Sequence, residues 1–250
     1  TGVQTCALPI SISVMPPWLG RPKWLALLAA VFGVVFVLAL TAPQRFSPSA
    51  LIHAGTTFVQ PEIAPPSLSQ IQPGDGYDGQ FYFRLALDPF TNQSQVDGVT
   101  LELPAYRAQR FLYPFLAWCL SVGRSAMLPW VLIGINLISL VVLVWAAARL
   151  FREQRVTPSW ALALAGLPSV VVALAHDVPE LLGLALLIGT VLALQRHQTY
   201  LAAAVLALGV LAYEPLVLLG FGRQNLSQTN RPMPRYDDAT PCARQRPHAH

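Results

Sequence analysis

The stretch LPWVLIGINLISLVVLVWAAARLFREQR, residues 128–155, joins an apolar run to a basic end. The run 128–148 has no charged residue, and about 20 apolar residues in a helix suffice to cross the hydrocarbon core of a membrane. Arg149, Arg152 and Arg155 follow directly, and basic residues beside a span mark its cytoplasmic end. The stretch therefore predicts a transmembrane helix whose C-terminal end lies in the cytoplasm.

The composition of the whole chain agrees with a membrane protein. Hydrophobic residues make up 54% of the 250 residues and charged residues only 11%, whereas soluble domains carry about a quarter charged residues. The net charge of +4 does not indicate a nucleic-acid-binding protein, because the arginines are dispersed or lie beside apolar runs. Cys6, Cys119 and Cys242 have no spacing typical of a disulfide or a zinc site.

Four further apolar runs predict membrane spans, at 24–42, 160–175, 178–194 and 200–221. The apolar run at 111–122 has only twelve residues, which favours a re-entrant or interface-lying helix over a span. We therefore expect an all-α polytopic membrane protein. It would have about five transmembrane helices and an extracytoplasmic loop with short interface or re-entrant helices.

The charges beside the apolar runs favour five spans over six. If Arg21 and Lys23 are cytoplasmic, the loop 43–127 is extracytoplasmic, and the basic residues after the second and fourth spans return to the cytoplasm. A sixth span at 111–122 would reverse this bias. We therefore expect a multi-pass protein with a cytoplasmic N-terminal segment, residues 11–23.

Both ends of the chain differ from its apolar middle. TGVQTCALPI, residues 1–10, resembles the in-frame translation of a short-read sequencing adapter, so we expect an assembly artefact there. Residues 222–250 are polar and rich in proline and arginine, which predicts either a disordered tail or a shift of reading frame near Gly222. We expect no function in either segment.

Several acidic residues are predicted at or near the extracytoplasmic face. Asp177 and Glu180 flank Pro179 between two spans, and two interpretations stay open: they cap a tight turn, or they face a cavity. Glu214 lies inside an apolar run beside Pro215, which breaks the helix and frees backbone groups. We expect Glu214 to line a functional cavity.

The outer loop contains GDGYDGQFYFRLALDPF, residues 74–90. Its glycines permit a bend that brings Asp75 and Asp78 close together. Residues 80–87 predict two helical turns, amphipathic and able to lie on the membrane surface. The ligand pattern of an EF-hand is missing, but a looser divalent-metal site at the two aspartates is one hypothesis.

Arg107 and Arg110 lie in YRAQRFLYPF, residues 106–115, and share a face of a short helix. A guanidinium group matches the oxygens of a phosphate diester, so one hypothesis is that they bind a substrate phosphate. The alternatives are lipid headgroups, or pairing with Asp75 or Asp88. No phosphate-cradling glycine loop precedes a helix, which disfavours an ATP-driven pump.

GYDGQFYFRLALDPF, followed by PAYRAQRFLYPFLAW and a helix with GINLISL, is similar to the N-terminal part of bacterial GT-C-type glycosyltransferases. The nearest resemblance is to mannosyltransferase-like membrane proteins that use polyprenol-phosphate-sugar donors, and it covers residues 24–219. It implies an enzyme of the bacterial cytoplasmic (inner) membrane that moves a sugar from a lipid-linked phosphate donor to an acceptor on the extracytoplasmic face. The implied partners are that donor and membrane lipids, with no nucleic acid and no nucleotide.

The resemblance also implies roles for single residues. Asp78 matches the essential aspartate of the family and would be the general base that takes the proton of the acceptor hydroxyl. Arg107 and Arg110 would hold the phosphate leaving group. Family members have more than five spans, so we expect a fragment, and Tyr213 stands before Glu214 where the family has a basic residue. The residues expected to contact the substrate are Asp75, Tyr82, Arg107, Arg110, Glu180 and Glu214.

Two other classes of protein fit parts of the sequence. A transporter or lipid flippase would place charged residues near the middle of the bilayer and often contains internal repeats, whereas the acids here gather at one face. A non-catalytic membrane scaffold would use the long outer loop as a protein-binding surface.

Overall fold

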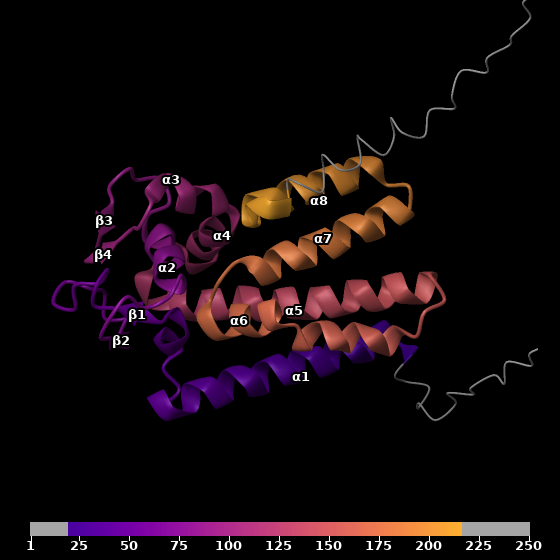
Figure 1. Cartoon of the computed structure of the whole chain (residues 1–250), viewed down its shortest axis with the longest axis horizontal. Helices are drawn as coiled ribbons and strands as arrows, with labels where there is room; N and C mark the ends of the chain where they lie inside the picture. Colours follow the sequence, from indigo (N-terminus) through magenta and orange to yellow (C-terminus); the bar gives the residue numbers. More distant parts are fainter. Residues whose placement is uncertain (1–19, 217–250) are drawn as a thin grey trace, which may run out of the picture. The chain divides into compact units, whose positions relative to one another are not determined.

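The computed structural model describes residues 20–216 of the chain. The adapter-like residues 1–10, residues 11–19 of the expected N-terminal segment, the end of the expected fifth span and the tail 222–250 lie outside the described residues. The described part is mostly helical (Figure 1). It consists of a group of roughly parallel and antiparallel helices, the helical bundle, and a compact segment between its first two long helices, residues 42–127, which we call the loop unit.

The bundle is built from apolar helices that begin with proline in several places. Proline suits the first helical turn, because the N–H it lacks would have no partner there. The elements of the bundle are α1 (Pro22–Thr41), α5 (Leu128–Glu153), the 3-10 helix η6 (Pro158–Gly166), α6 (Pro168–His176), α7 (Glu180–Gln195), α8 (Thr199–Ala212) and the 3-10 helix η7 (Glu214–Leu216).

The loop unit combines short helices with two minimal sheets. Strands β1 and β2 pair in parallel, and β3 and β4 form an antiparallel pair. The elements are η2 (Ala42–Gln44), η3 (Pro48–Ile52), β1 (Ala54–Gly55), β2 (Ile71–Gln72), α2 (Gly79–Leu87), β3 (Gln95–Val96), β4 (Val99–Thr100), α3 (Pro104–Arg107), η4 (Ala108–Arg110), α4 (Leu112–Ser121) and η5 (Ser125–Met127).

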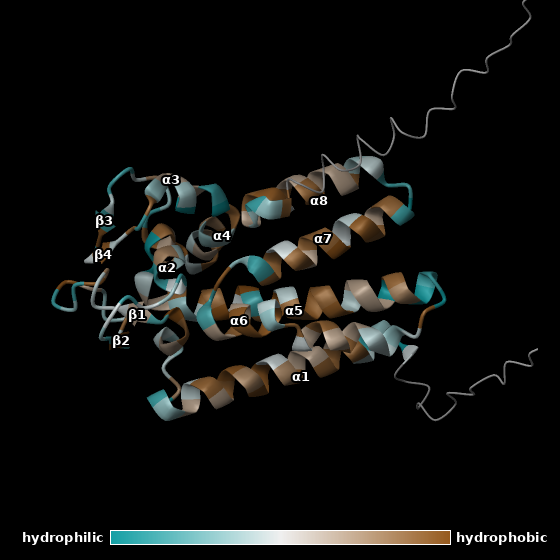
Figure 2. Cartoon of the chain, in the orientation of Figure 1, coloured by the Kyte–Doolittle hydropathy of each residue, from teal (hydrophilic) through white to brown (hydrophobic). Residues whose placement is uncertain are grey.

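Helices α1 and α5 pack closely through Gly33. A Cβ atom at this position would lie 2.8 Å from the side chain of Leu137 and 3.0 Å from that of Leu140, so a larger residue here would require these leucine side chains to shift. The opposite face of α1 exposes large apolar side chains such as Val31 and Val35. Figure 2 shows this apolar character along the bundle and a mixed character in the loop unit.

Fewer helices than expected are long enough to cross a membrane. Among the described residues, Pro22–Gln44 and Ser125–Glu153 qualify by length and hydropathy, and the bent pair η6–α6 would make a third span. Helices α7 and α8, with 16 and 14 residues, are only about 24 and 21 Å long. The expected five spans are therefore not confirmed.

Prolines explain two of these departures. The expected span at 160–175 bends by 55° between η6 and α6, because Pro168 forces Leu167 into an extended conformation. Helix α8 ends at Ala212, and Tyr213 is extended just before the Glu214–Leu216 turn that contains Pro215. This break lies where the sequence predicted one.

An ion pair ties two helices together at the end of the bundle far from the loop unit. Nη2 of Arg196, the residue after α7, lies 2.9 Å from Oε1 of Glu153, the last residue of α5. The two helices thus end level with each other there. Toward the loop unit, α7 and α8 stop short of α1 and α5 (Figure 1).

Helix α2 is buried inside the loop unit, which corrects the expectation of a surface-lying helix at 80–87. Every residue from Gly79 to Ala86 is buried. The side chain of Arg84 is fully buried, and its guanidinium group donates to the backbone carbonyls of Asp88 and Gln93. Protein carbonyls thus bind both Nη groups of Arg84, while its Nε is buried without a hydrogen-bond partner among the described residues.

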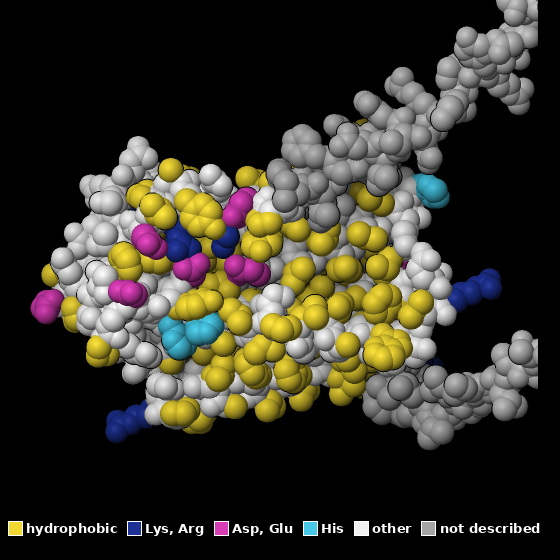
Figure 3. Space-filling view, in the orientation of Figure 1, with side chains coloured by type: hydrophobic (Ala, Val, Ile, Leu, Met, Phe, Trp, Pro, Cys, Tyr) yellow, Lys and Arg dark blue, Asp and Glu magenta, His cyan; other side chains and the backbone are white. Residues whose placement is uncertain are grey.

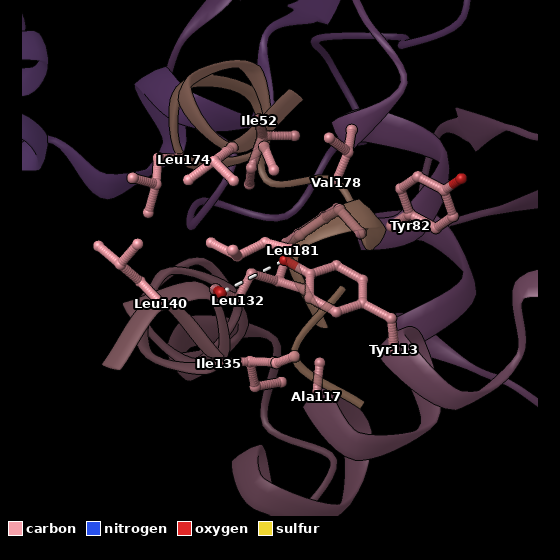
Figure 4. Close-up of a cluster of buried hydrophobic side chains, with 14 of the residues drawn as sticks. Ile52, Tyr82, Tyr113, Ala117, Leu132, Ile135, Leu140, Leu174, Val178 and Leu181 are labelled. Atoms are coloured by element: carbon pink, nitrogen blue, oxygen red, sulfur yellow. Dashed lines mark hydrogen bonds between the residues drawn. The ribbon is translucent and has the colours of Figure 1, made fainter. Parts of the chain in front are cut away.

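One apolar core runs from the loop unit into the bundle (Figure 4). The hydroxyl of Tyr113 in α4 donates to the carbonyl of Leu132 in α5 at 3.3 Å. The amide of Asn136 donates to the Tyr113 oxygen at 3.0 Å and to the carbonyl of Ala173 in α6 at 3.2 Å. These bonds fix α4 and α6 against the first half of α5.

Candidate functional site

Acidic and basic side chains gather where the loop unit meets the ends of α7 and α8 (Figure 3). Much of the remaining visible surface of the bundle is apolar. The polar cluster contains two arginines, Arg107 and Arg110, each only 7% exposed. Buried charges need ionic or hydrogen-bonding partners, so the partners of these two residues define the site.

The position of Asp78 is set by close backbone contacts. A Cβ atom on the next residue, Gly79, would lie 2.3 Å from the carbonyl oxygen of His176 at the end of α6. On the other side, the N–H of Tyr77 donates to the carbonyl of His53 at 2.8 Å. The bend that carries Asp78 is thus held between the loop unit and the bundle.

Aromatic rings reinforce this contact. The ring of His176 stacks on that of Tyr77, with 4.1 Å between centroids, and lies 4.3 Å from the ring of His53. Burial lowers the pKa of His53, which favours a neutral ring in this stack. Gln80 adds a polar brace: its side chain accepts from the N–H of Gly55 and donates to the carbonyl of Asp75.

Arg107 forms a bidentate ion pair with Asp78, in which its two Nη groups donate to the two carboxylate oxygens. The distances are 2.5 Å from Nη1 to Oδ2 and 2.8 Å from Nη2 to Oδ1. Nη2 also donates to Glu102 at 3.3 Å, and the guanidinium plane lies 4.5 Å from the ring centre of Phe81. Its Nε is buried and has no hydrogen-bond partner among the described residues, so Arg107 keeps an unused donor.

Arg110 uses all five of its N–H donors. Nε and Nη2 bind the two oxygens of Glu214 at 2.7 and 2.9 Å. Nη1 donates to the hydroxyl of Tyr82 at 2.8 Å and to Glu180 at 3.3 Å, and Nη2 also donates to the hydroxyl of Tyr106 at 2.9 Å. Arg110 therefore joins the loop unit to α7 and η7 with no donor to spare.

The electrostatic surroundings keep both arginines charged. Burial alone would lower the pKa of each guanidinium group, but the contacts with Asp78 and with Glu214 outweigh it, so both pKa values are raised. Burial also raises the pKa of Tyr82, although Arg110 opposes this effect. Tyr82 is therefore a neutral hydrogen-bonding partner, and it carries no charge at neutral pH.

An open pocket of about 280 Å³ lies beside Asp78. The side chain of Asp78 is 37% exposed, and Asp75 and Glu102 line the same pocket. The aromatic rings in the lining belong to Phe58, Tyr77 and Phe81. The pocket thus offers carboxylates as hydrogen-bond acceptors and aromatic faces for apolar contact.

A metal site at Asp75 and Asp78 does not fit this arrangement. Arg107 already holds both oxygens of Asp78, and one oxygen of Asp75 accepts a bond from the hydroxyl of Thr57 at 2.8 Å. Within residues 20–216, no group of three or more His, Cys, Asp or Glu side chains could hold a metal ion. Two engaged carboxylates are a poor ligand set for Ca²⁺ or Mg²⁺, which take about six or more oxygen ligands.

Asp177 is the left-handed C-cap residue of α6, and Pro179 is the N-cap residue of α7, so Asp177 does not take the helix N-cap position of the capping interpretation. Its side chain is 1% exposed, its backbone is left-handed, and neither carboxyl oxygen has a hydrogen-bond partner among the described residues. Burial raises the pKa of Asp177 well above its usual range, only partly opposed by Asn136. Glu180 contacts Arg110.

The structure brings most of the predicted site residues together. Asp78 and Arg107 form one pair, and Tyr82, Glu180 and Glu214 surround Arg110. The arginines do pair with carboxylates, but the suggested partners Asp75 and Asp88 were wrong.

Three contacts of the site were missing from the sequence-based list. Glu102 precedes α3 in an irregular segment, so no helical spacing connects it with Arg107. Tyr106 lies in the YR motif and only its spacing to Arg110 could have indicated the contact. The ring of Tyr213, the residue that replaces the expected basic one, lies 5.3 Å from the Arg110 guanidinium.

Comparison of the chain with protein families, curated proteins and solved structures finds no significant match. The geometry of the two arginines, the pocket and the carboxylates therefore carries the functional argument.

Proposed function

We propose that this chain is a membrane glycosyltransferase that moves a sugar from a lipid-linked phosphate donor to an acceptor hydroxyl. The observation that supports it best is the pocket at Asp78, which combines three carboxylates with three aromatic rings. Sugars present hydroxyl donors on their edges and C–H groups on their faces, so carboxylates and aromatic rings suit both. A volume of about 280 Å³ suits a small ligand such as one sugar unit.

In the proposed reaction, the oxygen of the acceptor hydroxyl forms a bond to the anomeric carbon of the donor sugar, and Asp78 takes the proton of that hydroxyl. The bond from that carbon to the phosphate oxygen breaks, and the lipid phosphate leaves with both electrons. Both oxygens of Asp78 accept hydrogen bonds from Arg107, so neither is free to receive the proton of an acceptor hydroxyl. Asp78 must therefore be released from Arg107 before it can accept a proton.

The donor phosphate provides this release in the proposal. Arg107 has an unused Nε–H and a fork that fits phosphate as well as carboxylate. When the phosphate takes the place of Asp78 on the two Nη groups of Arg107, the oxygens of Asp78 become free to accept the proton. Donor binding would thus activate the base and stabilise the leaving group in one exchange.

Arg110 has a different part in the proposal than the resemblance implied. With five hydrogen bonds already made, it can bind phosphate only by giving up Glu214 or a tyrosine. We therefore assign it a positioning role: it holds α7 and η7 against the segment that carries Arg107.

The proposed setting is the bacterial cytoplasmic membrane, with five crossings and a cytoplasmic N-terminus. Arg152 in the last turn of α5 and Arg196 after α7 support this orientation, since they lie at the end of the bundle away from the loop unit. The pocket would then face the extracytoplasmic side. Helices α7 and α8 would be the two short crossings.

A transporter or lipid flippase is the second candidate, and one observation favours it. The bent pair η6–α6 is followed directly by Asp177, a buried acid without a hydrogen-bond partner in the described part of the chain. Broken helices and buried acids line the substrate pathways of transporters. Such a protein would move a lipid-linked molecule without cleaving it.

The deciding experiment measures sugar release from radiolabelled polyprenyl-phosphate mannose and polyprenyl-phosphate glucose by the full chain in liposomes, with water as the acceptor hydroxyl. We expect release with one of them, and a loss of about 100-fold or more in Asp78→Asn, the usual size of a general-base contribution. Asp97→Asn is the matched control, because Asp97 is an exposed acid of the same loop unit outside the pocket. No release by the wild type, or equal release by Asp78→Asn, would overturn the proposal.

A further inference from the structure

Helix α4 lies beside the first half of α5, the longest helix, at the end of the bundle near the loop unit. Its Tyr113 bonds to the carbonyl of Leu132, four residues beyond the start of α5 at Leu128, or about 6 Å along the helix axis. Figure 4 shows Tyr113 and Ala117 of α4 facing Leu132 and Ile135 of α5. If α5 crosses a membrane, α4 is therefore level with the leaflet on the loop side.

Helices α6 and α7 end before they reach the level of α4. Helix α5 has 26 residues and α7 has 16, so their lengths differ by about 15 Å. The Glu153–Arg196 ion pair sets their far ends level, so the whole difference falls at the loop end. The Asn136–Ala173 bond agrees, because it places Ala173, almost one turn before the end of α6, beside a residue about 12 Å along α5 from Leu128.

The face of α4 that points away from the core is apolar. The buried residues of α4 are Tyr113, Pro114, Ala117 and Ser121, on the side that faces the core. No residue of the helix is charged. Aromatic rings extend this face: Phe111, Phe115 and Trp118 follow one another along the chain, and Phe90, from the segment after α2, packs on all three. We call these four residues the aromatic ladder; the centroids of contacting rings are 5.1 to 6.3 Å apart.

Apolar side chains are exposed at the ladder and at the end of α4. Phe90 is 65% exposed, whereas Phe111, Phe115 and Trp118 are half-buried. The end of the helix adds Leu120 and Val122, which are 59% and 79% exposed. Exposed apolar patches of this kind mark contact with a membrane or a partner. Arg124, an exposed cation, follows α4 directly, and a cation beside an aromatic and apolar face suits the phosphate layer of a membrane.

We propose that the aromatic ladder of α4 is covered by phospholipids of the leaflet on the loop side, with acyl chains against the rings and phosphates near Arg124. Because α6, α7 and α8 end below the top of α5, the membrane surface meets the protein at α4 and is locally thinned there. The inference concerns the placement of the chain in the bilayer and stands apart from the sugar-transfer reaction.

The exposed cysteine of α4 gives a direct test. Cys119 is free and exposed and follows Trp118, so a nitroxide label at this site reports the surroundings of the ladder. The variant carries Cys6→Ser and Cys242→Ser, which removes the other two cysteines. The measurement compares the collision rates of the label with oxygen, which concentrates in lipid, and with a water-soluble nickel chelate.

Two labelled controls define the extremes, each in a chain that also carries Cys119→Ser. Val35→Cys reports the exposed apolar face of α1, and Asp97→Cys reports an exposed position of the loop unit. We expect the label at Cys119 to collide with oxygen more than with the nickel chelate, as at Val35→Cys, but at a shallower depth.

Two results would overturn the proposal. A label at Cys119 that behaves as at Asp97→Cys would show that the ladder faces water. A label protected from both reagents would show that protein covers the ladder, either a second copy of the chain or another subunit. Neither result bears on sugar release by the wild type, so this proposal and the proposed function fail independently.

Discussion

Arg107 and Arg110 are separated by two residues and are equally buried, yet they are used in different ways. Arg107 binds the half-exposed carboxylates of Asp78 and Glu102 at the edge of a pocket and keeps a donor unused. Arg110 makes five hydrogen bonds that link four elements of the fold.

The difference shows that the number of hydrogen bonds an arginine already makes indicates its role better than its residue type does. A saturated arginine cannot bind a ligand without breaking contacts that hold the protein together, so its removal affects stability first. An arginine with an unused donor at a pocket can exchange partners, so its removal affects binding first. The next predictions test this division, beginning with the largest expected effect.

Arg110→Gln is expected to destabilise the protein strongly, by up to about 5 kcal/mol, because it leaves the carboxylates of Glu180 and Glu214 without a cation. Arg110→Lys should rescue only part of this loss, since an ammonium group has three N–H donors instead of five. The measurement is the thermal unfolding midpoint of both variants in one detergent. Unfolding of Arg110→Gln at the wild-type temperature would contradict the assigned clamp.

Arg107→Lys is expected to affect sugar release more than stability. The charge is kept, but the fork that matches phosphate is lost, at a cost of about 1.5–3 kcal/mol, or about 10- to 150-fold in rate. The unfolding midpoint should change less than in Arg110→Gln. If Arg107→Lys unfolds at the lower temperature of the two, the division between the arginines is wrong.

Asp177→Asn is expected to change how stability depends on pH. The folded pKa of Asp177 is raised by burial, so the proton binds more tightly in the folded protein. Its contribution to the free energy of unfolding is complete below the unfolded pKa, near 3.9, and is lost as the pH rises through the folded pKa. The slope of this loss is at most about 1.4 kcal/mol per pH unit.

The variant has no ionisable group at this position, so its stability relative to the wild type should increase as the pH rises above about 4. The measurement is the difference in unfolding midpoint between the two proteins across this pH range. A constant difference would show that Asp177 titrates alike in the folded and unfolded states.

Local patterns in the sequence predicted the elements that hydropathy alone controls. Helices α1 and α5 lie at the expected runs 24–42 and 128–148, and α4 lies at the short run 111–122. The amphipathic pattern of α2 was interpreted wrongly as a surface helix. Its Arg84 finds backbone carbonyls inside the loop unit, and such partners cannot be seen in a helical pattern.

The contacts of the site depend on the tertiary fold, so single residues could be named but their pairing could not. Arg110 and Glu214 are 104 positions apart, and the tertiary fold brings η4, which ends at Arg110, against η7, which begins at Glu214. The role of Asp78 as a base came from a resemblance, while its pairing with Arg107 came from the fold. The lengths of α7 and α8 likewise depend on where Pro179 and Pro215 permit a helix to begin and end.

The contact between Gly79 and His176 has a mechanical consequence. Backbone lies directly against backbone there, with the His176 carbonyl oxygen 2.3 Å from the position of an added Cβ atom, so no flexible side chain can absorb a displacement. A shift of the end of α6 must therefore move the neighbouring Asp78 with it. The bend between η6 and α6 and the position of the Asp78 carboxylate in the pocket therefore change together.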